Sequence, residues 1–156
     1  MKEPYEELIE GELVFRFGPS ETHEMVCVRL YEHINLAIKP ETPVKLLPIR
    51  AQVKYDSKTI LRPDITLITK AGSKIWLIVE IIDADDHHTD TVIKKSLYEE
   101  RKLPRLWMVD IRYQNVEIYH QTTYGFSLQR MYIDKEILTD ISLPGFELPV
   151  YKLFEK

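Results

Sequence analysis

The stretch Lys74-Ile75-Trp76-Leu77-Ile78-Val79-Glu80-Ile81-Ile82-Asp83 decides how the rest of the chain is arranged. Its apolar residues surround a single glutamate, in a run that is too short to span a membrane and is rich in isoleucine and valine. Such a run is typical of a strand that is buried on both faces. An unpaired carboxylate in this strand would be costly, so Glu80 must be neutralised, paired with a cation or placed beside a metal ion. Glu80 is therefore the first candidate site residue.

A helix is predicted over residues 89–101, after a polar loop that follows the central strand. Side chains three and four residues apart form a buried side and, at its margin, a separate stripe. The buried side comprises Ile93, Ser96 and Leu97, and the stripe comprises Asp90, Lys94 and Tyr98. On pattern alone, Asp90 and Lys94 are either an ordinary solvated salt bridge or part of a site.

The loop Asp83-Ala84-Asp85-Asp86-His87-His88 carries three aspartates and two histidines, as a metal site would. Adjacent histidines lack the spacing of a structural zinc site, however, and no cysteine accompanies them. We therefore expect a solvated loop whose polar residues cap the following helix.

Alternating apolar and polar residues predict further strands on both sides of this unit. These strands are Tyr5–Ile9, Glu12–Phe17, Val44–Leu47, Ile49–Tyr55, Ile60–Thr69, Leu106–Ile111, Val116–Gln121 and Phe126–Ile133. An amphipathic helix is predicted to begin at a cap, Ser20 or Thr22, and to end near Lys39-Pro40. Leu153 and Phe154 are expected to pack back onto the body. The order of these elements predicts an α/β or α+β fold with a mixed sheet and helices packed on it.

Composition limits the classes of protein to consider. The 156 residues are expected to form a single domain, 1–156, with a net charge of -4 and no apolar run of membrane-spanning length. The acidic N-terminus lacks a signal peptide's apolar segment, so we expect a cytoplasmic protein. The single cysteine, Cys27, is expected to be buried and inert. The acidic charge argues against a general phosphate-backbone binder, although bound cations would supply a positive field to an acidic nuclease.

Asp64, at a proline-marked strand, joins Glu80 and Lys94 as a third ionisable residue that this unit brings to one sheet edge. Two carboxylates suit Mg²⁺ or Mn²⁺, which bind hard oxygen ligands and leave positions for water and substrate phosphate. Lys94 would orient or deprotonate the attacking water. Asp64 capping a turn is the alternative on pattern alone, as is a surface or boundary position for His23.

Seven motifs in this order resemble the Uma family of putative restriction endonucleases, over nearly the whole chain. They are Glu7-Leu8-Ile9-Glu10-Gly11-Glu12-Leu13, Pro19 with His23, Arg62-Pro63-Asp64, Val79-Glu80-Ile81, Asp90 with Lys94 and Tyr98, Pro104-Arg105-Leu106-Trp107-Met108-Val109-Asp110, and Leu143-Pro144-Gly145-Phe146 with Leu153-Phe154.

The resemblance implies a restriction-endonuclease-like PD-(D/E)XK fold, with a mixed four- or five-stranded core sheet, that hydrolyses phosphodiester bonds of DNA with Mg²⁺. It makes Asp64 and Glu80 the motif carboxylates and metal ligands. Ile82 stands where the motif lysine is usual, and Lys94 matches the relocated lysine of this family. Glu7 matches an acidic position that would be a further ligand or a support, and His23, Asp90 and Tyr98 are supporting residues.

Two hypotheses follow. In the first, the chain is a Mg²⁺- or Mn²⁺-dependent endonuclease in which Asp64, Glu80 and the Ile81 carbonyl hold the ion. In the second, it is a catalytically inactive module of the same fold that binds a protein partner, an interpretation favoured by the acidic charge and the acidic loop 83–86. A homodimer is expected under both hypotheses.

Overall fold

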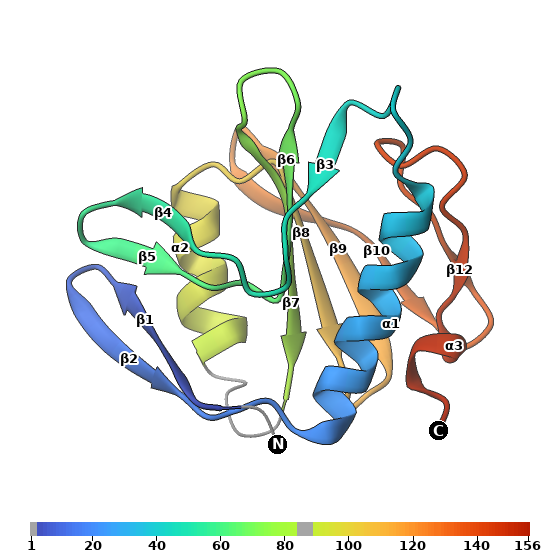
Figure 1. Ribbon diagram of the computed structural model, residues 1–156, viewed down its shortest axis with the longest axis horizontal. Helices are drawn as coiled ribbons and strands as arrows, with labels where there is room; N and C mark the ends of the chain where they lie inside the picture. The colour runs from blue at the N-terminus through green and yellow to red at the C-terminus, as the bar shows by residue number, and fades with distance from the viewer. Residues whose placement is uncertain (1–2, 84–88) are drawn as a thin grey trace.

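The computed structural model describes residues 3–83 and 89–156 (Figure 1). No helix among these residues is long and apolar enough to cross a membrane. The elements in chain order are β1 (Tyr5–Ile9), β2 (Glu12–Arg16), α1 (Glu21–Ala37), β3 (Val44–Leu46), β4 (Val53–Asp56), β5 (Thr59–Leu61), β6 (Ile65–Thr69), β7 (Ile75–Ile82), the π-helical segment η1 (Thr89–Lys94), α2 (Lys95–Glu100), β8 (Arg105–Asp110), β9 (Asn115–Thr122), β10 (Gly125–Ile133), β11 (Ile137–Leu138), β12 (Leu148–Pro149) and α3 (Tyr151–Phe154). The structure confirms the expected mixture of helices and strands.

The central sheet has the strand order β10-β9-β8-β7-β6-β3, with β7 in its interior. β7 runs antiparallel to β6 and parallel to β8, and Glu80 lies opposite Met108. Every residue of β7 from Leu77 to Ile82 is buried, which confirms the strand predicted from the sequence. The sheet is larger than the four or five strands expected, because β3 extends it beyond β6 and β10 extends it beyond β9.

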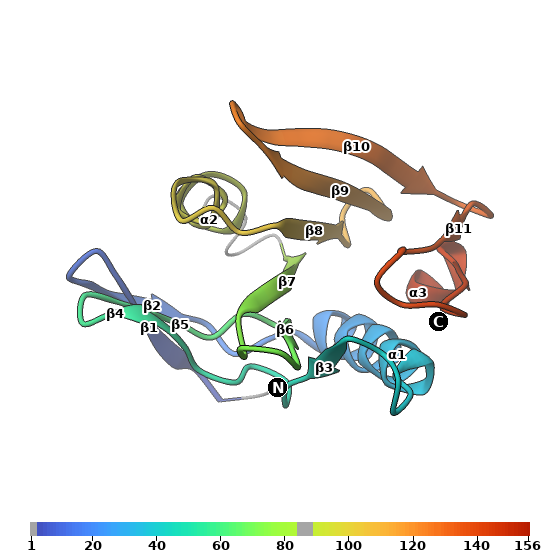
Figure 2. The same ribbon diagram turned by 90° about the horizontal axis from the view of Figure 1, so that it is seen from above.

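Helices cover both faces of this sheet. α1 and α3 lie on one side and α2 on the other (Figure 2). Because side chains alternate along β7, Val79 and Ile81 pack into the core on the α1 side, whereas Ile78 and Ile82 pack into the core with α2. Leu153 and Phe154 of α3 are buried in the first core, as predicted.

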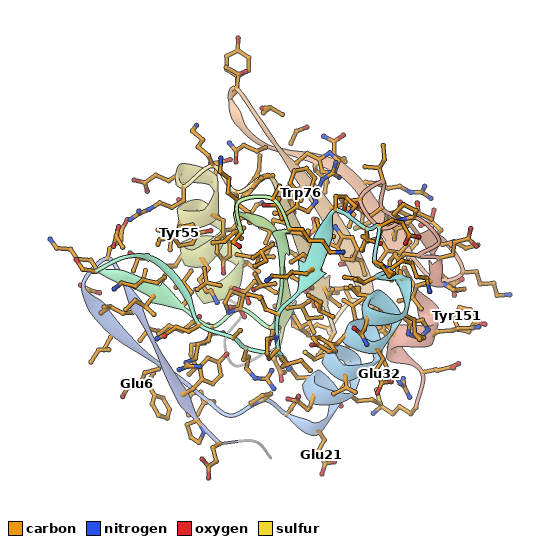
Figure 3. The ribbon with its side chains drawn as sticks, turned by 45° about the horizontal axis from the view of Figure 1, so that its top comes forward. Glu6, Glu21, Glu32, Tyr55, Trp76 and Tyr151 are labelled. Atoms are coloured by element: carbon orange, nitrogen blue, oxygen red, sulfur yellow. The ribbon has the colours of Figure 1, made fainter. Side chains whose placement is uncertain are left out.

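A second sheet, with the order β2-β1-β5-β4, lies on the α2 side (Figure 1). Glu10 and Gly11 join β1 to β2 with φ angles of 49° and 89°, the backbone that a two-residue hairpin turn requires. Tyr55 of β4 lies beside α2 and packs against the second core (Figure 3). This hairpin pair therefore brings β1 and β2 over the same side of the central sheet as α2.

The structure corrects the strand predicted over Ile49–Tyr55. β4 begins only at Val53, because the Ala51 N–H donates to the Pro48 carbonyl at 3.0 Å and closes a turn. Arg50 lies inside this turn with a φ of 55°, which no strand residue adopts.

The helix predicted over 89–101 differs in geometry and in its buried side. Its first six residues are π-helical, and the α-helix follows from Lys95 to Glu100. Ile93 is 39% exposed and Ser96 is also exposed, so two of the three residues expected on the buried side are not buried. The stripe expected at the margin is buried instead, because Asp90 and Lys94 form ion pairs with charged residues on β1, β2 and β7.

Candidate active site

Asp64 follows Pro63 at the junction between β5 and β6, and it is 4% exposed. Both carboxylate oxygens are held. Oδ1 accepts a hydrogen bond from Arg50 Nη1 at 3.1 Å, and Oδ2 accepts one from the Ile81 backbone N–H at 2.8 Å. Asp64 thus bonds to β7 at the residue after Glu80, and its side chain bridges strands instead of capping its own turn.

His23, in the first turn of α1, lies against the same group of atoms. Ser20 caps this helix by accepting the His23 backbone N–H at 3.1 Å, which fixes where the imidazole starts. His23 Nε2 lies 3.1 Å from the Ile81 carbonyl oxygen and 3.4 Å from Asp64 Oδ2. The expected surface or boundary position is wrong, since His23 is only 7% exposed. Asp64 Oδ2 and the Ile81 carbonyl oxygen therefore both lie next to one imidazole nitrogen, His23 Nε2.

Glu80 projects from β7 towards α2 and is buried. Its Oε2 is in contact with Lys94 Nζ and accepts a hydrogen bond from the Tyr98 hydroxyl at 2.7 Å. No hydrogen bond from another described residue engages Oε1. The strand carboxylate is therefore paired with a cation, which is one of the outcomes that the sequence required.

Lys94 also bonds to the first strand, and an ionic chain continues from there. Its Nζ lies 2.9 Å from Glu7 Oε2, while Arg16 Nη1 lies 2.5 Å from Glu7 Oε1. Arg16 Nη2 then lies 2.9 Å from Asp90 Oδ1. Lys94 and Asp90 are buried, so the interpretation of this pair as a solvated salt bridge is wrong. Instead, the five charged groups of Glu7, Arg16, Glu80, Asp90 and Lys94 form one network.

The carboxylates of Asp64, Glu80 and Asp90 differ in pKa, because burial and neighbouring charges act on them to different extents. Burial raises the pKa of Glu80 to about 8, against the opposing charge of Lys94. Burial likewise raises the pKa of Asp90 to about 6. Burial also acts on Asp64, but the neighbouring His23, the Ile81 N–H and Arg50 outweigh it and hold the pKa of Asp64 far below its ordinary value. The two proposed metal ligands thus differ in how readily each loses its proton.

The charge of Lys94 is fixed. Burial would lower its pKa, but the carboxylates of Glu7, Glu80 and Asp90 outweigh burial and raise the pKa well above its ordinary value. Lys94 is therefore a permanent hydrogen-bond donor and positive charge, and it is no base. Of the two roles expected from the sequence, orienting a water fits this state and deprotonating one does not.

Two hollows lie beside these residues. The first is small, with about 20 Å³ open to the centres of water molecules, which is room for roughly one water. Its lining comprises Tyr5, Arg16, Phe17, Gly18, Pro19, His23, Ile81, Asp83 and Asp90. The second is open and larger, about 570 Å³ by the same measure, and is lined by Glu3, Tyr5, Glu6, Ile49, Arg50 and Arg62. Tyr5 lines both of them.

The donor atoms fit a hard divalent cation. Asp64 Oδ2 and the Ile81 carbonyl oxygen lie 3.4 and 3.1 Å from the same nitrogen, His23 Nε2, and Glu80 directly precedes Ile81 in β7. In residues 3–83 and 89–156, no three His, Cys, Asp or Glu side chains are grouped as ligands of one ion. Mg²⁺ needs no such group, because one or two carboxylates suffice when water and substrate phosphate fill the other positions. Asp83 accepts a hydrogen bond from Ser20 Oγ at 2.6 Å, and the rest of the acidic loop, 84–88, lies outside the described residues.

Sequence reasoning missed Arg16 and Tyr5, and it expected Arg50 only as a basic side chain at the border of the cleft. Arg16 was treated only as part of a strand, yet it joins Glu7 to Asp90. Tyr5 lines both hollows, and Arg50 donates to Asp64. The sequence carries no signal for Arg16, because alternation makes Leu13, Phe15 and Phe17 the apolar face of the strand and places Arg16 on the opposite face.

Comparison with known proteins adds a family and a fold. A family model described as Uma2, putative restriction endonuclease, matches residues 2–151. The crystal structure of a putative nuclease belonging to DUF820 from Anabaena variabilis has a TM-score of 0.78 and 16% sequence identity, and the match covers 98% of this chain and 91% of that one. At this identity the likeness shows the fold alone. No curated protein matches the chain.

Proposed function

The chain belongs to the Uma2 family of putative restriction endonucleases, and from this premise we propose that it is a metal-dependent endonuclease that hydrolyses phosphodiester bonds of DNA. The observation that supports the proposal most is that Asp64 Oδ2 and the Ile81 carbonyl lie at the same imidazole nitrogen, one residue along β7 from Glu80, which contacts Lys94. The resemblance to the crystal structure of a putative nuclease supports the fold on which this site is built.

Asp64, Glu80 and the Ile81 carbonyl would hold Mg²⁺ or Mn²⁺, which when bound would act as a Lewis acid at the phosphate and lower the pKa of a bound water. Lys94 has three N–H donors, of which Glu7 and Glu80 occupy two. The third would orient the attacking water. Tyr98 donates to Glu80 and fixes the direction of that carboxylate, and Asp90 holds Arg16 against Glu7.

The larger hollow is the side from which substrate would approach. Arg50 and Arg62 bring two guanidinium groups to it, next to Asp64. Arg62 Nη1 donates to the Arg50 carbonyl at 3.4 Å, and no carboxylate of a described residue forms an ion pair with it. A phosphodiester would therefore find one guanidinium available for bidentate binding, in a protein whose overall charge is negative.

The experiment is a cleavage assay on supercoiled plasmid and on labelled single- and double-stranded oligonucleotides, titrated with Mg²⁺ or Mn²⁺. We expect cleavage that EDTA abolishes, and that Asp64→Asn, Glu80→Gln and Lys94→Gln each reduce at least tenfold relative to a control, Lys135→Gln, outside the site. Cleavage that persists equally in all three variants would remove these roles.

A catalytically inactive binding module is the second candidate, and a specific observation favours it. The Glu80–Lys94 pair is buried and closed, with side chains that are 3% and 0% exposed, so a cation must compete with Lys94 for Glu80. Under this candidate no metal binds and the wild-type chain cleaves nothing. Metal titration of the wild-type chain therefore distinguishes the two candidate functions before any variant is made.

We also propose a homodimer through β2. Among the described residues β2 pairs with β1 alone, and Leu13 and Phe15 of this strand and Phe17 directly after it are 70%, 56% and 58% exposed. Antiparallel pairing of two copies about Val14 would set Leu13 of one copy opposite Phe15 of the other, so the exposed apolar side chains of the two copies would meet. Sedimentation of the wild type and of Phe15→Lys tests this: a dimer that Phe15→Lys dissociates supports it, and a wild-type monomer contradicts it.

A further inference from the structure

Arg50 occupies a backbone conformation that suits glycine or asparagine better. The Ala51 N–H donates to the Pro48 carbonyl at 3.0 Å, so Pro48 to Ala51 form a four-residue turn, and Arg50 is its third residue. Its φ is 55°, the positive value that this position of a type II turn requires. A non-glycine residue in such a conformation is strained. The arginine therefore needs a reason other than the turn.

The side chain of Arg50 supplies that reason. Its Nη2 contacts both carboxylate oxygens of Glu24, at 2.8 and 2.6 Å, and its Nη1 donates to Asp64 Oδ1 at 3.1 Å. The backbone adds a second link, since the Arg50 N–H donates to the Asp64 carbonyl at 3.1 Å. Glu24 belongs to the first turn of α1, one residue after His23. Arg50 thus joins α1 to the start of β6, because its guanidinium bonds to the Asp64 side chain and its backbone N–H to the Asp64 carbonyl.

These bonds fix the orientation of the Asp64 carboxylate. With Oδ1 bound by Arg50 and Oδ2 by the Ile81 N–H, the carboxylate plane has one orientation, and Oδ2 is the oxygen that lies beside His23 Nε2, which also contacts the Ile81 carbonyl. Without the guanidinium, Oδ1 would have no donor among the described residues, and the carboxylate would be held at one oxygen only.

We propose that Arg50, held by Glu24, is a positioning residue that fixes Asp64 for binding a divalent cation. This inference rests on the proposed function, because it names how the proposed metal ligand is oriented. Residues that bond to metal ligands from outside typically change metal affinity about 10- to 100-fold when they are removed. Arg50 would not touch the ion itself.

Charge must be kept constant in the test, because removing a cation near the site by itself strengthens cation binding. The double variant Glu24→Gln/Arg50→Asn removes one positive and one negative charge, and asparagine accepts a positive φ. Arg50→Lys keeps the charge, but a single ammonium cannot reproduce the guanidinium's planar, two-sided bonding. Gln114→Asn is the matched control, because Gln114 also has a positive φ, 52°, in a turn outside the site.

The readout is the Mn²⁺ affinity of the protein without nucleic acid, measured by titration calorimetry, together with the thermal unfolding temperature in EDTA. We expect the double variant to bind Mn²⁺ about 10- to 100-fold more weakly, Arg50→Lys to lie between it and the wild type, and Gln114→Asn to match the wild type. Equal Mn²⁺ affinity in the wild type and the double variant, with or without a loss of stability, overturns the positioning role while leaving the proposed function intact. A wild type that binds no Mn²⁺ overturns both.

Discussion

Lys94 Nζ lies 2.9 Å from Glu7 Oε2, across 87 residues of chain, so the helical segment after the central strand is bonded to the first strand of the molecule. Lys94 is fully buried and Glu7 is 2% exposed. The same amine contacts Glu80 on β7. The lysine proposed to act on water thus also joins three elements of the fold, and its removal affects stability as well as catalysis.

Lys94→Met is expected to destabilise the fold. It leaves Glu7 beside Arg16 but deprives Glu80 of its cation, and breaking a buried ion pair on one side costs about 3–5 kcal/mol. Glu80→Gln/Lys94→Met should recover part of that loss, because the double variant no longer buries a carboxylate without its cation. Urea unfolding measures both. If the single variant unfolds at the wild-type midpoint, the Lys94–Glu80 pair contributes nothing to stability.

Stability without metal is expected to fall as the pH rises from 4.5 to about 8. The pKa of Glu80 is raised from its ordinary 4.5 to about 8, so the folded protein holds this proton more tightly than the unfolded chain does. The resulting stability is full below pH 4.5 and is lost as the pH passes the folded pKa. Asp90, with its pKa raised to about 6, adds to the lower part of the same range.

Thermal unfolding in EDTA over this pH range measures the effect, with Glu80→Gln as the control. Glutamine cannot titrate, so this variant should show a flatter profile than the wild type. A wild-type profile that rises with pH, or an identical slope in Glu80→Gln, would contradict the raised pKa of Glu80.

Tyr98→Phe tests the hydrogen bond to Glu80. The hydroxyl donates to Oε2 at 2.7 Å, and a bond to a charged or protonating carboxyl contributes about 0.5–3 kcal/mol. Because the ring remains, packing in the second core is preserved. We expect a loss of stability within that range and weaker Mn²⁺ binding, by calorimetry, as Glu80 gains freedom. Stability and Mn²⁺ affinity that both equal those of the wild type would exclude a supporting role for Tyr98.

Most of the strands could be predicted because apolar runs and turn residues mark them locally along the chain. The run from Ile75 to Ile82 can only be an interior strand, and Glu10-Gly11 fits the tight hairpin found there. Arg50 misled the prediction, since neighbouring β-branched residues favour a strand while a turn hydrogen bond between Pro48 and Ala51 decides the structure. Local patterns carry no information on such a bond.

The candidate site was predictable in its members and much less in its connections. Glu80 could be singled out because a carboxylate in an apolar strand demands a partner, and the structure supplies Lys94. The burial of Asp90 and Lys94 could not be read from helical spacing, because residues 89–94 are π-helical and their partners come from distant strands. Arg16 and Arg50 matter through contacts over long sequence separations, which one sequence does not reveal.

The most direct test of the account is a crystal structure of the protein with Mn²⁺, recorded at the manganese absorption edge. If these oxygens hold the cation as proposed, the map shows one anomalous peak bonded to Asp64 Oδ2, the Ile81 carbonyl and Glu80, with Lys94 still bonded to Glu7. An anomalous map without a peak at these oxygens, in a molecule whose Glu80 and Lys94 stay paired as they are here, would contradict it.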